Sequence, residues 1–194
     1  MQLSRAPYVR GMVGKGRHPI LGVWSPDPVL STVAPIGLAA AAGTALLVDL
    51  ATTSRTTSRT LADLVSEGPK LAELSPGRPG VALIAGGNVD RSLGVDMLGQ
   101  LAGHWPAIVV RSPDTELPFA TVPVIPLFPG ILAPTPRVGH GVWQPVGAGA
   151  EPPGPGPVLP RLRGRLVRRM LSGHLPRRSR WMDAWRPIWE MPWA

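Results

Sequence analysis

The first candidates for chemistry in this sequence are polar side chains that follow short apolar runs. Ser31 and Thr32 come shortly after the run ILGVW, and Asp49 lies near the end of the run TALLVDLA. The arginines close to such runs are Arg55, Arg59 and Arg111. Hydroxyl and guanidinium groups together bind phosphate oxygens well. One interpretation is therefore a small enzyme that acts on a phosphorylated substrate.

The duplicated motif TTSR at 52–55 and 56–59 has a second interpretation. Ser and Thr often precede helices, because their hydroxyl groups accept hydrogen bonds from the first backbone amides of the helix. The motif here is followed by TLADLV, in which Leu61, Leu64 and Val65 share one helical face. We therefore favour a loop with a capping Thr or Ser that leads into a helix.

Other catalytic and metal-binding patterns are missing from the sequence. The four histidines are His18, His104, His140 and His174, and none of them stands at a metal-ligand spacing from another histidine or an acid. The absence of cysteine excludes disulfides, thiolate nucleophiles and cysteine-bound zinc. The carboxylates are scattered, and the nucleophile motif Gly-x-Ser-x-Gly does not occur. We predict no catalytic residue, no metal site and no cofactor.

The apolar runs predict the elements that position these side chains. Strands are expected at 20–24, 44–51, 81–85 and 107–111, with an extended segment at 121–128. Helices are expected at 29–42, from residue 60, and at 91–104. Pro123 and Pro126 favour an edge position for the last segment, since proline has no amide hydrogen to donate. Strands that alternate with helices predict a three-layer α/β domain with a mostly parallel sheet of about five strands.

Composition divides the chain into four parts. These are a flexible basic leader at 1–18, the α/β domain at 19–132, a Pro/Gly-rich linker at 133–157 and a basic, Trp-rich helical extension at 158–194. The net charge of +8 is concentrated at the two ends, which favours an anionic partner. The uncharged stretch 29–48 has two other interpretations, a transmembrane helix or a signal peptide, but its Ala and Gly residues are only weakly apolar.

The C-terminal extension carries the clearest functional pattern. Between 159 and 175, apolar side chains recur every four residues and arginines lie between them, which predicts an amphipathic basic helix. The residues expected to contact a membrane or a partner are Arg161, Leu162, Arg165, Leu166, Arg168, Arg169, Trp181 and Trp185. Three interpretations remain open: contact with an anionic membrane surface, contact with a protein partner or with the domain itself, and contact with nucleic acid.

Several short segments also occur in an order that is typical of one family. LLVDLA at 46–51 is followed by TLADLV at 60–65, GPKLAEL at 68–74, ALIAGG at 82–87, DMLGQLAGHW at 96–105 and PAIVVR at 106–111. In this order they resemble the deviant Walker P-loop ATPases of the ParA and MinD type, and the resemblance covers about residues 19–132. It implies a P-loop α/β fold with a phosphate loop after the first strand.

Two positions depart from the pattern of that family. The loop position reads SPDPVLST, without the Gly and Lys that bind phosphate, and Arg111 stands where the family has an acid. The resemblance therefore implies a degenerate member that has lost ATP hydrolysis. In such a member, Ser31, Thr32 and Asp49 would be the remnant of a nucleotide and magnesium site.

The pattern and the resemblance together predict the function and the location of the protein. MinD-like proteins end in a membrane-targeting amphipathic helix, and the pattern at 159–175 predicts an amphipathic helix in the corresponding C-terminal part of this chain. Our leading hypothesis is a non-catalytic, cytoplasmic adaptor or localisation protein, held peripherally at the inner face of the membrane. Its partner would be a protein, either an intact ATPase relative or a second copy. The alternatives are a nucleic-acid-associated protein and the phosphoryl-ligand enzyme described above.

Overall fold

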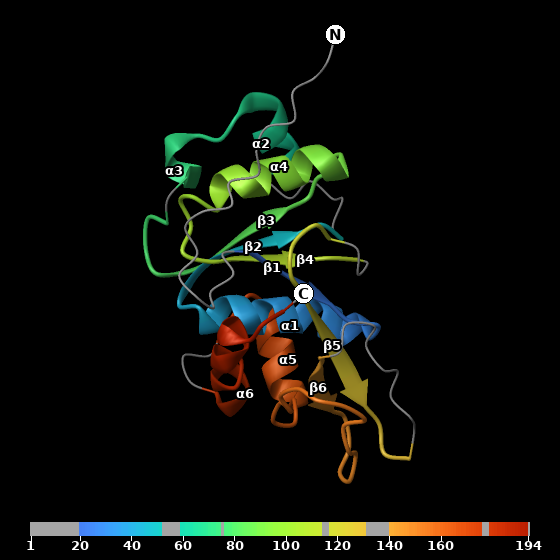
Figure 1. Ribbon diagram of the computed structural model, residues 1–194. Helices are drawn as coiled ribbons and strands as arrows, with labels where there is room; N and C mark the ends of the chain where they lie inside the picture. Colours follow the sequence, from blue (N-terminus) through green and yellow to red (C-terminus); the bar gives the residue numbers. More distant parts are fainter. Residues whose placement is uncertain are drawn as a thin grey trace.

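The protein is a three-layer α/β fold built on a six-stranded parallel sheet (Figure 1). The structure, a computed structural model, describes residues 20–51, 59–74, 76–113, 117–130, 140–175 and 179–193. The strand order is β3-β2-β4-β1-β5-β6. The strands are β1 (Ile20–Trp24), β2 (Thr44–Asp49), β3 (Gly80–Ala85), β4 (Ile108–Arg111), β5 (Thr121–Leu127) and β6 (Val142–Pro145).

One face of the sheet is covered by α1 (Pro28–Ala41), which runs between β1 and β2. Asp27 caps this helix, and its carboxylate accepts a hydrogen bond of 2.8 Å from the amide of Leu30. Pro35 lies inside the helix and is buried, yet the helix continues to Ala41. No helix within the described residues is long and apolar enough to cross a membrane.

The opposite face is covered by α2 (Leu61–Glu67), α3 (Leu71–Leu74) and α4 (Arg91–Leu101) (Figure 1). Thr60 begins α2 with a capping box, in which its hydroxyl accepts from the Asp63 amide and the Asp63 carboxylate accepts from the Thr60 amide. Leu61 and Leu64 are buried. The predicted loop with a capping Thr is therefore confirmed at Thr60, whereas 52–58 lies outside the described residues.

The C-terminal extension packs against α1 and forms part of the same core. It contains α5 (Gly164–Leu171), α6 (Arg180–Asp183) and a short 3-10 helix, η1 (Arg186–Glu190). The indole of Trp189 donates a hydrogen bond of 3.0 Å to the carbonyl of Leu38 in α1. Gly37 of α1 gives the indole rings of Trp181 and Trp185 room, since a Cβ there would lie 2.6 Å from each ring. Helix α5 is also shorter than the predicted span 159–175.

The sheet has one more strand than predicted, because a strand lies in the segment expected to be a linker. Residues 142–145, within the predicted linker 133–157, form β6 and pair with β5. The run VWQP is too short to show strand periodicity, and its pairing with β5 comes from the fold. Trp143 of this strand is fully buried.

Strand β5 is internal, so the predicted edge position was wrong. The Ala120 carbonyl accepts from Gly22 of β1, and the Leu127 carbonyl accepts from Val146 after β6. Since backbone groups alternate in direction along a strand, Pro126 faces the β1 side and Pro123 faces the β6 side. The β1 pairing ends at Pro123, and the β6 pairing begins one residue later. Each proline therefore lacks its amide hydrogen on a side where β5 is not paired with the neighbouring strand, so no hydrogen bond of the sheet is lost.

Candidate functional site

The carboxyl ends of β2 and β4 carry an ion pair. Asp49 and Arg111 are register partners on these neighbouring strands, and their carboxylate and guanidinium groups lie 2.9 Å apart. The other carboxylate oxygen of Asp49 accepts a hydrogen bond of 3.0 Å from the amide of Ala51. The carboxylate is thus held by the protein's own groups at the position where parallel sheets bind ligands.

The two predicted hydroxyl residues lie on the first turns of α1. The hydroxyls of Ser31 and Thr32 donate to the carbonyl of Pro28 at 2.9 and 3.0 Å. Both hydroxyls are therefore used within their own helix. Asp27 places its carboxylate at the amino end of α1, where a bound anion would otherwise meet the helix dipole.

A groove of about 290 Å³ brings Thr32, Asp49 and Arg111 together. Ser31 is not among its lining residues. The rest of its lining is almost entirely apolar and comes from α1, β2, β3 and the end of α5: Pro35, Ile36, Leu47, Val81, Leu83, Met170, Leu171, Gly173 and Leu175. Three of the predicted polar residues therefore line a mostly apolar groove, rather than a phosphate pocket.

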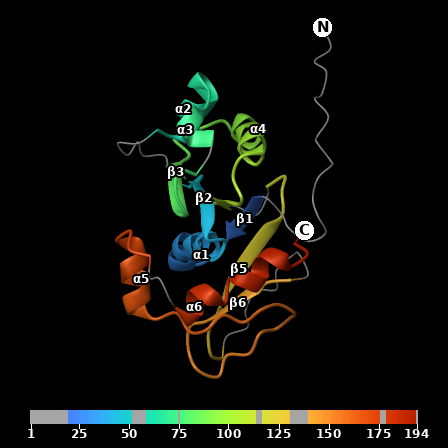
Figure 2. The ribbon, with the colours of Figure 1, turned by 90° about the vertical axis from the view of Figure 1, so that its left-hand side faces the viewer.

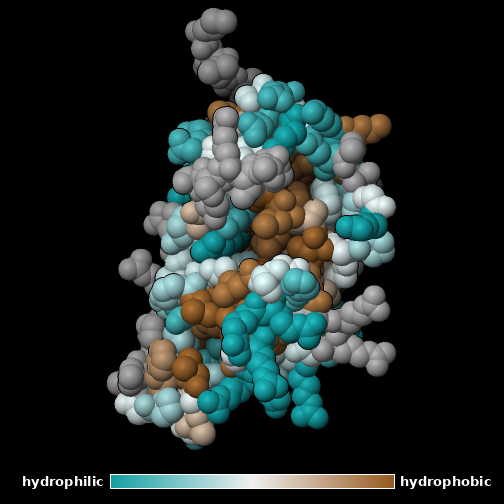
Figure 3. Space-filling view, turned by 180° about the vertical axis from the view of Figure 1, so that it is seen from behind, coloured by the Kyte–Doolittle hydropathy of each residue, from teal (hydrophilic) through white to brown (hydrophobic). Residues whose placement is uncertain are grey.

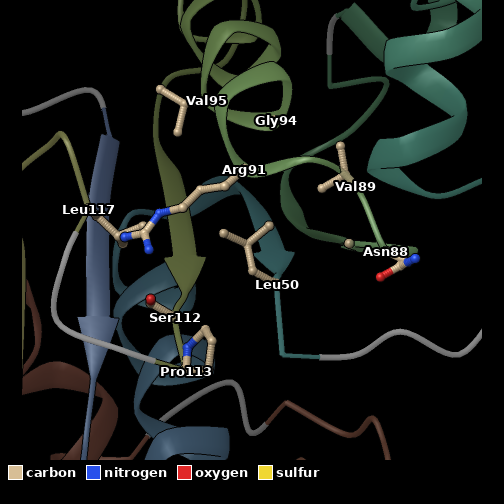
Figure 4. A pocket seen from close by; sticks show the side chains of 10 residues that line it. Leu50, Asn88, Val89, Arg91, Gly94, Val95, Ser112, Pro113 and Leu117 are labelled. Carbon is tan, nitrogen blue, oxygen red and sulfur yellow. The ribbon is translucent and has the colours of Figure 1, made fainter.

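A second, smaller cavity of about 180 Å³ lies at the carboxyl ends of β2, β3 and β4, beside α4. Arg91 extends from α4 across this cavity towards Leu117, above Leu50 and Ser112 (Figure 4). The amino end of α4 is capped by Asp90, which accepts from the amides of Ser92 and Leu93. As in α1, the protein's own carboxylate occupies the helix end that would attract an anion.

Six exposed arginines of the extension form what we call the arginine surface, which consists of Arg161, Arg163, Arg165, Arg168, Arg169 and Arg180. Arg186 is also exposed but pairs with Asp183. Five of these, all but Arg168, line one hollow between α5 and α6. None of the six makes an ion pair within the described part of the chain. Arg163 and Arg180 were not among the predicted contact residues. Arg163 directly precedes α5 in the chain, whereas only the fold brings Arg180 beside that helix.

The apolar residues predicted in the same extension face the core. Leu162 and Leu166 are half-buried against the core that α1 forms, and Met170 is buried. Trp181 and Trp185 are both buried, with their rings 5.3 Å apart in an edge-to-face contact. The indole of Trp181 donates a hydrogen bond of 2.6 Å to the side chain of Gln144 in β6. Among the residues predicted to contact a membrane or a partner, the arginines are exposed, whereas the leucines and tryptophans pack against the core.

The remaining polar candidates do not assemble into a catalytic site. Arg59 pairs with Glu67 and Glu73, and its guanidinium also donates to the carbonyl of Gly68. Arg55 and His18 lie outside the described residues. Among the residues that the structure describes, no group of three His, Cys, Asp or Glu side chains is placed to hold a metal ion.

The carboxyl edge of the sheet therefore offers an internal ion pair, an apolar groove and a small cavity, and the extension offers exposed positive charge. Comparison of the chain with models of protein families, with curated proteins and with solved structures finds no match.

Proposed function

We propose that this protein is a non-catalytic adaptor or localisation protein of the ParA/MinD-like type, which binds an anionic membrane surface peripherally. The observation that carries this proposal is the arginine surface, where six exposed arginines lie together without an ion pair in the described chain. Each Lys or Arg near an anionic bilayer contributes about 1 kcal/mol, so six supply several kcal/mol at physiological salt.

The packing of the extension decides how such binding would work. Leu162, Leu166 and the tryptophans face the core, so insertion of these side chains into the bilayer would require unfolding of the extension. Binding is instead an electrostatic contact between guanidinium groups and lipid head groups. Such a contact is screened by salt, whose Debye length falls from about 10 Å at 0.1 M to about 3 Å at 1 M.

The non-catalytic part of the proposal is supported by the strand ends. The carboxylate of Asp27 caps α1, Asp49 pairs with Arg111, and the Thr32 hydroxyl bonds within α1. A nucleotide phosphate at the amino end of α1 would meet a negative charge where binding needs positive charge. These arrangements favour an adaptor over a phosphoryl-transfer enzyme.

The test is co-sedimentation of the full chain with vesicles. The vesicles contain either phosphatidylcholine alone or phosphatidylcholine with phosphatidylserine. We expect binding to the anionic vesicles only, and its loss in high salt. The variant R165E/R169E should bind at least about a hundredfold more weakly, because two attractive charges of about 1 kcal/mol each are removed and replaced by repulsive ones.

A matched variant controls for net charge. K70E/R78E changes the charge by the same amount at exposed residues outside the arginine surface, and should retain most of the binding. Equal binding to neutral vesicles, or equal loss in both variants, would contradict the proposal. Preferential binding to DNA in the same salt series would favour the nucleic-acid alternative, although the buried Trp181 offers no stacking surface.

A further inference from the structure

One edge of the sheet is open. Strand β3 ends the strand order and pairs with β2 alone among the described strands. At the other end, β6 is followed by an additional parallel bridge between Trp143 and Val158. The sequence of β3, GVALIA, has no charge and no proline, which are the features that usually prevent an edge strand from pairing further.

The backbone direction shows which groups of β3 are available. The amide of Gly86, just after the strand, donates to the Asp49 carbonyl of β2 at 2.8 Å. Since backbone groups alternate in direction along a strand, the amides and carbonyls of Val81, Leu83 and Ala85 point away from β2. Backbone groups of this kind require a hydrogen-bond partner, from water or from another chain.

Hollows lie on both faces of this edge. On the α5 side is the groove of about 290 Å³ described above, to which β3 contributes Val81 and Leu83. On the α2 side is a hollow of about 870 Å³, lined by residues 81–84 of β3 and by Leu64, Leu101 and Trp105 among others. Its charged lining residues are Arg78 and the ion pair of Arg59 with Glu73. Side chains of an added strand would point alternately to these two faces, which is the arrangement used in strand addition.

The apolar surface at this edge is exposed. Leu83 is 67% exposed, and Leu171 and Leu175, at and beyond the end of α5, are 56% and 38% exposed. β3 and α5 lie on the same side of the molecule (Figure 2). Viewed from behind, hydrophobic surface occupies the middle of the molecule, next to a dense hydrophilic region lower down (Figure 3).

The charges around the edge indicate what binds there. Arg78 is exposed just before β3, and Arg168 lies three residues before Leu171, on the same side of α5. A second copy of this chain would bring the same cations to the interface. A bilayer cannot satisfy the free backbone groups of β3, since its hydrocarbon has no hydrogen-bonding groups. Both arguments favour a peptide segment with acidic residues.

We propose that the open edge of β3 binds an extended segment of a partner protein by strand addition. The segment contains a short apolar run, whose side chains enter the two hollows, and acidic residues on either side of the run. This proposal extends the proposed function, because an adaptor needs a protein partner, but it rests on the edge of β3, which shares only Arg168 with the arginine surface. Loss of peptide binding and loss of vesicle binding are therefore separate outcomes.

The test uses the full chain and a fluorescein-labelled peptide, EEVIVLEE, with blocked ends. Fluorescence anisotropy should show saturable binding to the wild type, with at least tenfold weaker binding to KKVIVLKK and to EEVPVLEE. The variant L83K should weaken binding of EEVIVLEE about tenfold. The control L93K changes a leucine that is 50% exposed on α4, away from the edge, and should bind normally.

Hydrogen exchange provides the second measurement. The amides of Val81 and Leu83 should exchange rapidly in the free protein and become protected in the complex. L83K should retain the melting temperature of the wild type, because the side chain is mostly exposed. Vesicle binding by L83K should match that of L93K, which carries the same added charge.

Four results would overturn the proposal. They are no saturable binding of EEVIVLEE, equal binding of KKVIVLKK, unchanged exchange of the β3 amides, and concentration-dependent protection of those amides in the protein alone. The last result would show that a second copy occupies the edge. If L83K lost vesicle binding instead, the edge would belong to the membrane-binding surface.

Discussion

Asp49 and Arg111 join the carboxyl ends of β2 and β4 through an ion pair of 2.9 Å between register partners. Their side chains are only 18% and 21% exposed, so the pair is neither fully solvated nor fully buried. The Nε of Arg111 is buried, and no hydrogen-bond partner for it lies among the described residues. The positive charge of the Arg111 guanidinium therefore depends on the Asp49 carboxylate for much of its stabilisation.

This dependence predicts the effect of breaking the pair. D49A should lower the free energy of unfolding by about 1–2 kcal/mol, between the values typical of exposed and buried pairs. R111M should cost less, because Asp49 keeps its bond from Ala51 and the Met side chain fills part of the space. Urea unfolding of both single variants and the double variant measures the coupling. Additive effects would show that the pair contributes nothing.

The strand-end geometry also predicts the response to nucleotide. Excess Mg-ATP should leave the melting temperature unchanged, because ligands stabilise only the state they bind. T32V should behave as the wild type in this assay, since its hydroxyl bonds only within α1. A rise in melting temperature that D49N or T32V abolishes would contradict the non-catalytic proposal.

The contact between α1 and the extension predicts opposite effects for two glycine substitutions. G37A should destabilise the protein by about 1–3 kcal/mol, because its Cβ would lie 2.6 Å from the indole rings of Trp181 and Trp185. G99A, on α4 with no atom within 4 Å of the added Cβ, should stabilise it by about 0.5–1 kcal/mol. Chemical denaturation measures both. Stabilisation in both variants would mean that the extension does not pack on α1.

Two buried tryptophans predict a difference that depends on a single hydrogen bond. The indole nitrogen of Trp189 donates to the Leu38 carbonyl at 3.0 Å, whereas that of Trp185 has no partner within the part of the chain that the structure describes. Both W189F and W185F lose ring volume, but only W189F leaves a carbonyl without its donor. W189F should therefore be more destabilising by about 1 kcal/mol or more. Equal losses would show that the bond to Leu38 is not formed.

The cap of α4 predicts a pH dependence. A hydrogen bond from the Ser92 hydroxyl, with further bonds from the amides of Leu93 and Ser92, lowers the pKa of Asp90 below its ordinary value of 3.8. A lowered pKa stabilises the folded state above the unfolded-state value, and this contribution is lost as the pH falls through the folded-state value. The stability difference between wild type and D90N should therefore shrink below about pH 4.

Carbon-13 NMR of the Asp90 carboxyl group measures its pKa directly, and unfolding curves at several pH values measure the stability difference. Asn keeps a capping oxygen without the charge, so D90N isolates the contribution that titrates. A carboxyl pKa at or above the ordinary value would show that the Ser92 bond is absent in solution.

Much of the fold follows from local sequence. The apolar runs that end at Trp24, Ala85 and Arg111 predicted three strands to within a residue, because parallel strands are short and continuously apolar. The same pattern did not show that β3, unlike the other two, is largely exposed. The capping Thr60 followed from side-chain chemistry within one turn. Strand β6 and the internal position of β5 could not be predicted from local sequence, because they depend on pairing partners that are distant in the chain.

The fold class, the polar residues at the strand ends and the alternation of Arg and Leu in the extension could all be predicted before folding was considered. These properties depend on the spacing of residues within one element. The contact of Asp49 with Arg111, the packing of Trp181 and Trp185 against α1 and the open edge at β3 arise only when the chain is folded. An amphipathic pattern shows that one face will be buried, but the surface that covers it depends on contacts between segments that are distant in sequence.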